Sequence, residues 1–86
     1  MENGADKQVI EFTLLDEKPQ GYFVEWAIRP STSSPGKWMG SFQAHKEGEP
    51  ALRESIANQY DNPAEAQANT IRIARARVEE VAAAKG

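Results

Sequence analysis

The chain has 86 residues, 40% of them hydrophobic and 27% charged, which predicts a single globular domain and excludes a disordered chain. Its 13 acidic and 10 basic residues give a formal net charge of −3, a balance that disfavours a general nucleic-acid binder. The absence of cysteine excludes disulfides, thiolate catalysis and cysteine-ligated zinc, and with no apolar run of about 18 residues the sequence predicts a cytoplasmic protein without a membrane span.

The first 15 residues divide into a tail and a strand. Residues 1–7 are polar, and we expect a disordered tail ahead of a single α+β domain at 8–86. Residues 8–15 alternate between apolar and polar side chains, as a half-buried strand does. The alternation predicts Phe12 and Leu14 on the side that faces the core.

Two further strands are predicted on either side of a loop rich in serine and proline. Residues 22–29 contain aromatic and β-branched residues that suit a strand, with Tyr22 and Val24 facing inward. Residues 37–46 follow the loop as the third strand. Gly40 within this strand predicts a point where another backbone or a large ring approaches closely.

Residues 50–60 leave two structures open. Leu52, Ile56 and Tyr60 recur every four residues, a spacing that fits one face of a strand or of a helix. Residue propensities favour a helix, whereas a hairpin turn at Gly48 favours a fourth strand at the edge of the sheet. We favour the edge strand.

The segment 62–84 carries the signals of a long helix. Asn62 can cap it, Pro63 suits the first helical position, and Glu65 can reach back towards the cap. The residues expected to face the core share one side of this helix: Ala64, Gln67, Ile71, Ala74, Val78, Val81 and Ala82. The elements together predict an α+β fold, a three- to four-stranded antiparallel meander with one long C-terminal helix packed on one face.

Three apolar residues are candidates for a protein interface. If the helix covers one face of the sheet, the open face exposes Phe23 and Met39, and Ile73 lies off the helix stripe. Contiguous exposed apolar patches mark interfaces, whereas scattered apolar side chains are normal on a surface. The expected partner is an unknown protein or a second copy of the chain in a homodimer.

Basic residues on the sheet and the helix give a second functional hypothesis. Nucleic-acid contacts are considered for Arg29, Lys37, Arg53, Arg72, Arg75 and Arg77. The expected architecture is similar to that of integrase arm-binding and double-stranded-RNA-binding domains, a likeness that does not fix function. The helix arginines also suit a salt-bridged surface, with Arg75 and Glu79 as an i,i+4 pair, and the acidic total favours this interpretation.

No motif indicates an enzyme or a bound cofactor. His45 is the only histidine, and the nearby Glu47 and Glu49 lie in a turn that we expect to be exposed. The sequence contains no nucleophile elbow, phosphate-binding loop, dinucleotide fingerprint or metal-ligand spacing. We therefore expect a non-enzymatic interaction module that uses neither a metal nor a cofactor.

The half of the chain from 36 to 81 combines several local patterns. Residues 36–38 open a strand that includes Phe42, Gly48 forms a turn, and 60–66 leads into the final helix. In this order the patterns resemble those of small bacterial proteins of unknown function that have a β-meander followed by a C-terminal helix. The resemblance implies that architecture and assigns no functional residue.

Overall fold

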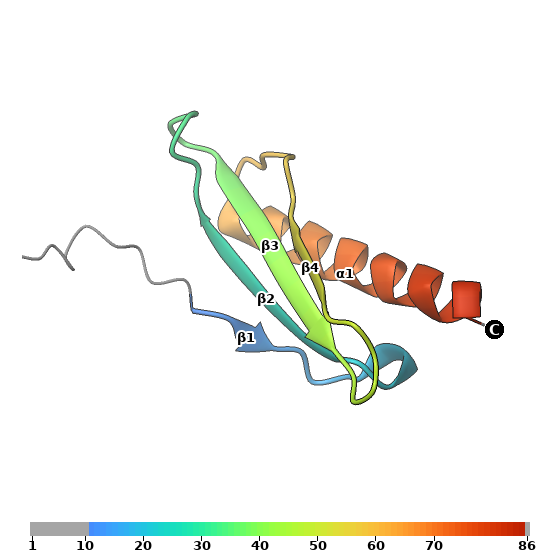
Figure 1. Cartoon of the computed structure of the whole chain (residues 1–86). Helices are drawn as coiled ribbons and strands as arrows, with labels where there is room; N and C mark the ends of the chain where they lie inside the picture. Colours follow the sequence, from blue (N-terminus) through green and yellow to red (C-terminus); the bar gives the residue numbers. More distant parts are fainter. Residues whose placement is uncertain (1–10, 86) are drawn as a thin grey trace, which may run out of the picture.

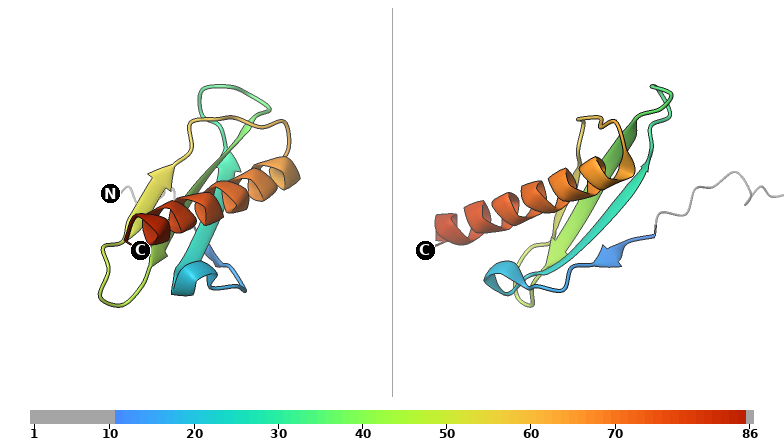
Figure 2. Two further views of the ribbon diagram at one scale, coloured as in Figure 1. Left: turned by 90° about the vertical axis from the view of Figure 1, so that its right-hand side faces the viewer. Right: turned by 180° about the vertical axis from the view of Figure 1, so that it is seen from behind.

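The computed structural model describes residues 11–85 as a four-stranded antiparallel sheet with one long helix across one face (Figure 1; Figure 2). The elements are β1 (Thr13–Leu14), a 3₁₀ turn η2 (Pro19–Gly21), β2 (Phe23–Pro30), β3 (Trp38–His45), β4 (Leu52–Ser55) and α1 (Pro63–Lys85). The strands neighbour one another in chain order, which confirms the predicted α+β meander with a packed C-terminal helix. The tail predicted at residues 1–7 lies outside the described residues.

The first strand faces the other way from the prediction. Leu14 pairs with Glu25 of β2 and is 53% exposed. The Leu15 N–H donates to the Val24 carbonyl at 2.7 Å, and Leu15 packs against the core. The prediction that Leu14 faces the core is therefore wrong, because the pairing with β2 turns the second of two adjacent leucines inward.

Residues 50–60 contain an edge strand, as predicted, and β4 pairs with β3 in antiparallel register. Just beyond β4, the Ile56 N–H donates to the Gly40 carbonyl at 2.9 Å. Tyr60 then forms an isolated bridge with Trp38. The whole segment therefore follows β3 until the chain turns into α1.

The helix begins at the predicted cap. The Asn62 side-chain oxygen accepts from the Glu65 N–H at 2.8 Å, and the Glu65 carboxylate accepts from the Asp61 N–H at 3.2 Å. Pro63 occupies the first helical position, where its missing N–H costs no helical hydrogen bond. Within the described chain, no helix combines the length and apolar character that a membrane span requires.

The buried side of α1 is rotated from the predicted stripe. Four small or medium residues are fully buried on it: Ala66, Thr70, Ala74 and Val78. Ile73 packs against the core, whereas Ala64 and Gln67 are exposed and Ile71 lies outside the core cluster. Ile73, which the sequence had placed off the buried side, therefore contributes to the packing of the core. Ala74 and Val78 were predicted on the buried side, whereas Ala66 and Thr70 were predicted to point away from it.

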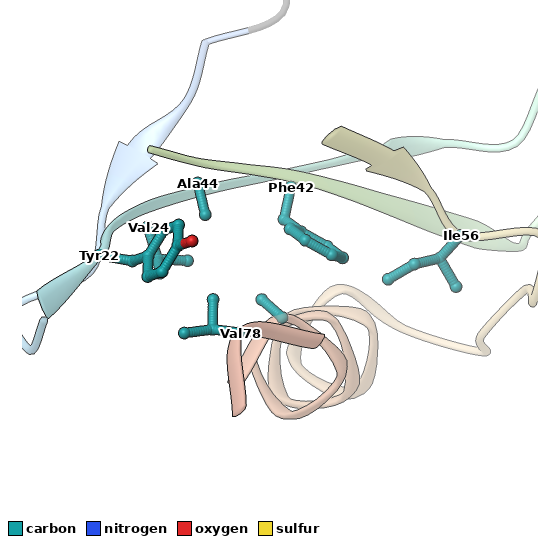
Figure 3. Close-up of a cluster of buried hydrophobic side chains, with 7 residues drawn as sticks. Tyr22, Val24, Phe42, Ala44, Ile56 and Val78 are labelled. Carbon is teal, nitrogen blue, oxygen red and sulfur yellow. The ribbon is translucent and has the colours of Figure 1, made fainter. Parts of the chain in front are cut away.

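The core lies between α1 and the centre of the sheet (Figure 3). Strand side chains point from β2 and β3 towards the helix, and Ile56 closes the cluster beyond β4. The buried residues of this core cluster are Tyr22, Val24, Phe42, Ala44, Ile56, Ala74 and Val78. This cluster therefore lies on one side of the sheet, whereas Ala27, which is 4% exposed, is buried on the opposite side.

Candidate functional site

The candidate site is the side of the sheet that faces away from α1, which we call the outer face (Figure 2). Residues paired across antiparallel strands share a face. The strand registers therefore arrange the outer face in rows: Arg29 with Met39; Ala27, Ser41 and Ser55; Leu14, Glu25, Gln43 and Arg53; Phe23 with His45. Within residues 11–85, no helix or second sheet covers these rows.

The outer face carries exposed apolar side chains. Leu14 on β1 is 53% exposed and Phe23 on β2 is 38% exposed, and these are the exposed large hydrophobic residues of the described chain. Met39 on β3 is half-buried on the same face. The structure thus places Phe23 and Met39 on the open face, as predicted, and adds Leu14, which the sequence had assigned to the core.

Phe23 lies at the centre of a small cluster at one end of the outer face. Its ring stacks on the ring of His45, its cross-strand neighbour, with the centroids 5.5 Å apart and the planes 22° apart. The Lys18 ammonium lies 4.6 Å from the centroid of the Phe23 ring. The cluster holds an exposed aromatic ring in a fixed position between a strand neighbour and a cation.

A row of polar residues crosses the outer face with its charges at opposite sides. The Gln43 side-chain amide donates to the Glu25 carboxylate at 2.7 Å, linking β3 to β2. On the other side of Gln43 from Glu25, Arg53 of β4 is its cross-strand neighbour, and the Arg53 side chain is exposed. The row therefore places an acid on β2 and a base on β4, with an amide between them on β3.

The six predicted nucleic-acid contacts do not form one basic surface. Arg29 and Arg53 lie on the outer face, whereas Arg72, Arg75 and Arg77 project from α1. Three of the six cations are held by carboxylates: Lys37 by Asp61, Arg75 by Glu17 at 2.7 Å, and Arg77 by Glu54 at 2.9 Å with Glu80 at 3.8 Å. Arg72 donates to the Asn69 side chain at 2.7 Å.

The predicted pairing within α1 is also different. Among the described residues, Arg75 pairs with Glu17 of the turn before β2, where the sequence had suggested Glu79. The local helix spacing could not reveal this contact, because it depends on how the helix lies over the turn. The effect is to tie the middle of α1 to the segment that leads into β2.

Two of these ion pairs shift the pKa of their partners. The hydrogen bond and the charge of Asp61 raise the pKa of Lys37 above its usual value, and the same contacts lower the pKa of Asp61 below 3.8. The hydrogen bond to Glu54, followed by its charge, raises the pKa of Arg77. Both pairs favour the charged forms of their members. The charges of Lys37 and Arg77 are therefore balanced by carboxylates of the same chain, which leaves less net positive charge for a phosphate backbone.

Comparisons with known proteins add no further assignment. Neither the protein-family models, nor the curated proteins, nor the solved structures contain a match to this chain. Among residues 11–85, no group of three or more histidine, aspartate or glutamate side chains is placed to hold a metal ion. The case for function therefore rests on the geometry of the outer face.

Proposed function

We propose that this protein is a small, non-enzymatic interaction module of the cytoplasm that binds a protein partner through its outer face. One observation carries the proposal: Leu14 and Phe23, the exposed large hydrophobic residues of the described chain, lie on the one sheet face that α1 leaves open. Apolar side chains gathered on an otherwise polar surface mark interaction sites. The partner is another protein or a second copy of this chain.

The residue types around Leu14 and Phe23 support a protein partner. Protein interfaces are enriched in aromatic residues, methionine and arginine. The outer face supplies these types in Phe23, Met39, Arg29 and Arg53. The sheet also provides a rigid base, so that the face binds with little loss of conformational entropy.

The non-enzymatic part of the proposal draws on the surroundings of the single histidine. A catalytic base needs a partner that orients it and a pocket that excludes water. His45 is exposed and its ring stacks on Phe23. This contact suits a packing role on the interaction surface.

Nucleic acid is the second candidate partner, and one observation favours it. Arg29 and Arg53 share the outer face, and neither is held by a carboxylate of the described residues. Phosphate binding weakens as salt rises, because counterions are released on binding. A salt titration with a single-stranded and a double-stranded oligonucleotide tests this alternative, and lack of binding at low salt removes it.

A photo-crosslinking experiment tests the proposed function directly. A photoreactive phenylalanine analogue replaces Gln43 on the outer face or, as the matched control, Ala76 on the exposed side of α1. In cells, we expect discrete protein adducts from position 43 and few from position 76. Equal or absent adducts from the two positions would contradict an outer-face interaction module.

A further inference from the structure

We propose that the partner of the outer face is a second copy of this chain, stacked face to face. The two copies are related by a two-fold axis that lies midway between the two sheets and parallel to β3. The inference rests on the proposed function and adds the identity of the partner and the alignment of the two sheets. Paired sheets commonly stack with their strands within about 30° of each other and with the sheets about 10 Å apart. The two-fold axis makes the two contributions to the interface identical.

The polar row of the outer face gives this arrangement its charge complementarity. Glu25 and Arg53 flank Gln43 on opposite sides, one on β2 and the other on β4. A two-fold axis along β3 exchanges the positions of β2 and β4. Glu25 of each copy therefore faces Arg53 of the other, which forms two equivalent ion pairs, while Gln43 faces its own counterpart.

The neighbouring rows are compatible with the same axis. The adjacent row consists of the small residues Ala27, Ser41 and Ser55. Ala27 is already buried in the single chain at 4% exposure, so Ser41 and Ser55 supply the contact surface of this row. At the next position beyond the polar row, Phe23 faces the segment before β4, where Ala51 leaves room for its ring. The axis thus brings small residues together at the centre and places the aromatic ring opposite a small side chain.

The size of the outer face sets the strength of the association. β2 and β3 have eight residues each, β4 has four and β1 has two, so at a rise of about 3.3 Å and a strand spacing of about 4.8 Å the face covers roughly 350 Å². Stable complexes bury about 800 Å² on each partner. The dimer is therefore weak, with a dissociation constant in the micromolar range or above, and it exchanges with the monomer.

The chain's own charges favour a second copy over nucleic acid on this face. Glu25 lies in the middle of the outer face and repels a phosphate backbone, whereas in the dimer it meets an arginine. The carboxylate accepts one hydrogen bond from Gln43 through one oxygen, which leaves its second oxygen for Arg53 of the other copy. The Glu25 carboxylate thus binds Gln43 of its own chain and Arg53 of the other copy at the same time.

Charge reversal tests the alignment, using sedimentation equilibrium of the full chain over a wide concentration range. Glu25→Arg alone places two arginines together at each contact, and Arg53→Glu alone places two glutamates together. We expect each variant to self-associate at least about tenfold more weakly than the wild type. An equimolar mixture of the two variants restores association as a heterodimer, because both contacts again pair opposite charges. The double variant in one chain likewise regains self-association.

Matched controls separate the interface from general charge effects. Arg72→Glu and Glu79→Arg change the same charges on the exposed side of α1 and should leave self-association unchanged. Circular dichroism verifies that every variant is folded. Failure of the mixture to exceed the single variants, with all of them folded, would overturn the proposed alignment.

The outcomes also distinguish this inference from the proposed function. A strictly monomeric wild type that still gives adducts with other proteins from position 43 overturns the second-copy proposal and leaves the interaction module standing. A monomeric wild type without outer-face adducts overturns both. A monomeric wild type that binds an oligonucleotide through Arg29 and Arg53 overturns the dimer in favour of a nucleic-acid partner.

Discussion

Gly40 of β3 lies directly beneath Thr70 of α1, and the two residues fix how closely the helix approaches the sheet. A Cβ atom on Gly40 would lie 1.8 Å from the Thr70 hydroxyl oxygen and 3.0 Å from the Thr70 Cβ. Both residues are buried. The contact confirms a close approach at Gly40, but the approaching group is the Thr70 side chain and not the backbone or large ring that the sequence suggested.

Gly40→Ala should lower the free energy of unfolding by about 1–3 kcal/mol, because the added methyl group forces α1 away from β3. Chemical denaturation monitored by circular dichroism measures the change. The control is Ser41→Ala, the next residue along β3 on the outer face, which should change stability little. A Gly40→Ala variant as stable as the wild type would contradict the packing of Thr70 on β3.

Thr70→Val should leave the free energy of unfolding unchanged or raise it by up to about 1 kcal/mol. The reason is that the Thr70 hydroxyl is buried without a hydrogen-bond partner among the described residues, so that folding strips it of water without compensation. Thr70→Ser keeps the hydroxyl and loses a buried methyl group, and it should cost about 1 kcal/mol. Paired denaturation curves compare the two variants, and a larger loss in Thr70→Val than in Thr70→Ser would rule out this explanation.

The sequence predicted the elements well and the orientation of two of them poorly. The cap at Asn62, the strands around Gly40 and the edge strand followed from local signals, since capping and alternation depend on near neighbours. The inward leucine of β1 did not, because Leu14 and Leu15 are both apolar and only the pairing with β2 chooses between them. The rotation of α1 depends on Gly40, which lies in another element.

The rotation of α1 makes a direct prediction about two isoleucines. Ile73→Ala should lower the free energy of unfolding by about 2 kcal/mol, because Ile73 packs against the core cluster. Ile71→Ala should cost less, because Ile71 lies outside that cluster. Thermal and urea unfolding of the two variants give the comparison, and the reverse order would restore the helix stripe expected from the sequence.

The ion pair of Lys37 with Asp61 should make stability depend on pH at the acidic end. Asp61 has a pKa lowered by Lys37, so its stabilising effect is present above the ordinary value of 3.8 and is lost as the pH falls through the lower folded-state pKa. Asp61→Asn should melt slightly below the wild type at neutral pH, with the difference disappearing once the pH falls below the lowered pKa of Asp61. Lys37→Gln should show the same trend. A melting difference that stays constant with pH would contradict the assignment.

The outer face was only partly visible in the sequence. Phe23 and Met39 were found because alternation along β2 and β3 assigns them to the side away from the core. Leu14 was missed because β1 was oriented wrongly. The row of Glu25, Gln43 and Arg53 was missed because it depends on the registers of three strands, which no local pattern specifies.

The most direct test of an outer-face interaction surface is an amide NMR spectrum recorded as a function of protein concentration. We predict shifts that grow with concentration at the outer-face rows of β2, β3 and β4, centred on Gln43, while the exposed side of α1 around Ala76 stays constant. The shifts should vanish in Arg53→Glu. Spectra that do not change up to high concentration, or that change chiefly along α1, would contradict self-association through the outer face.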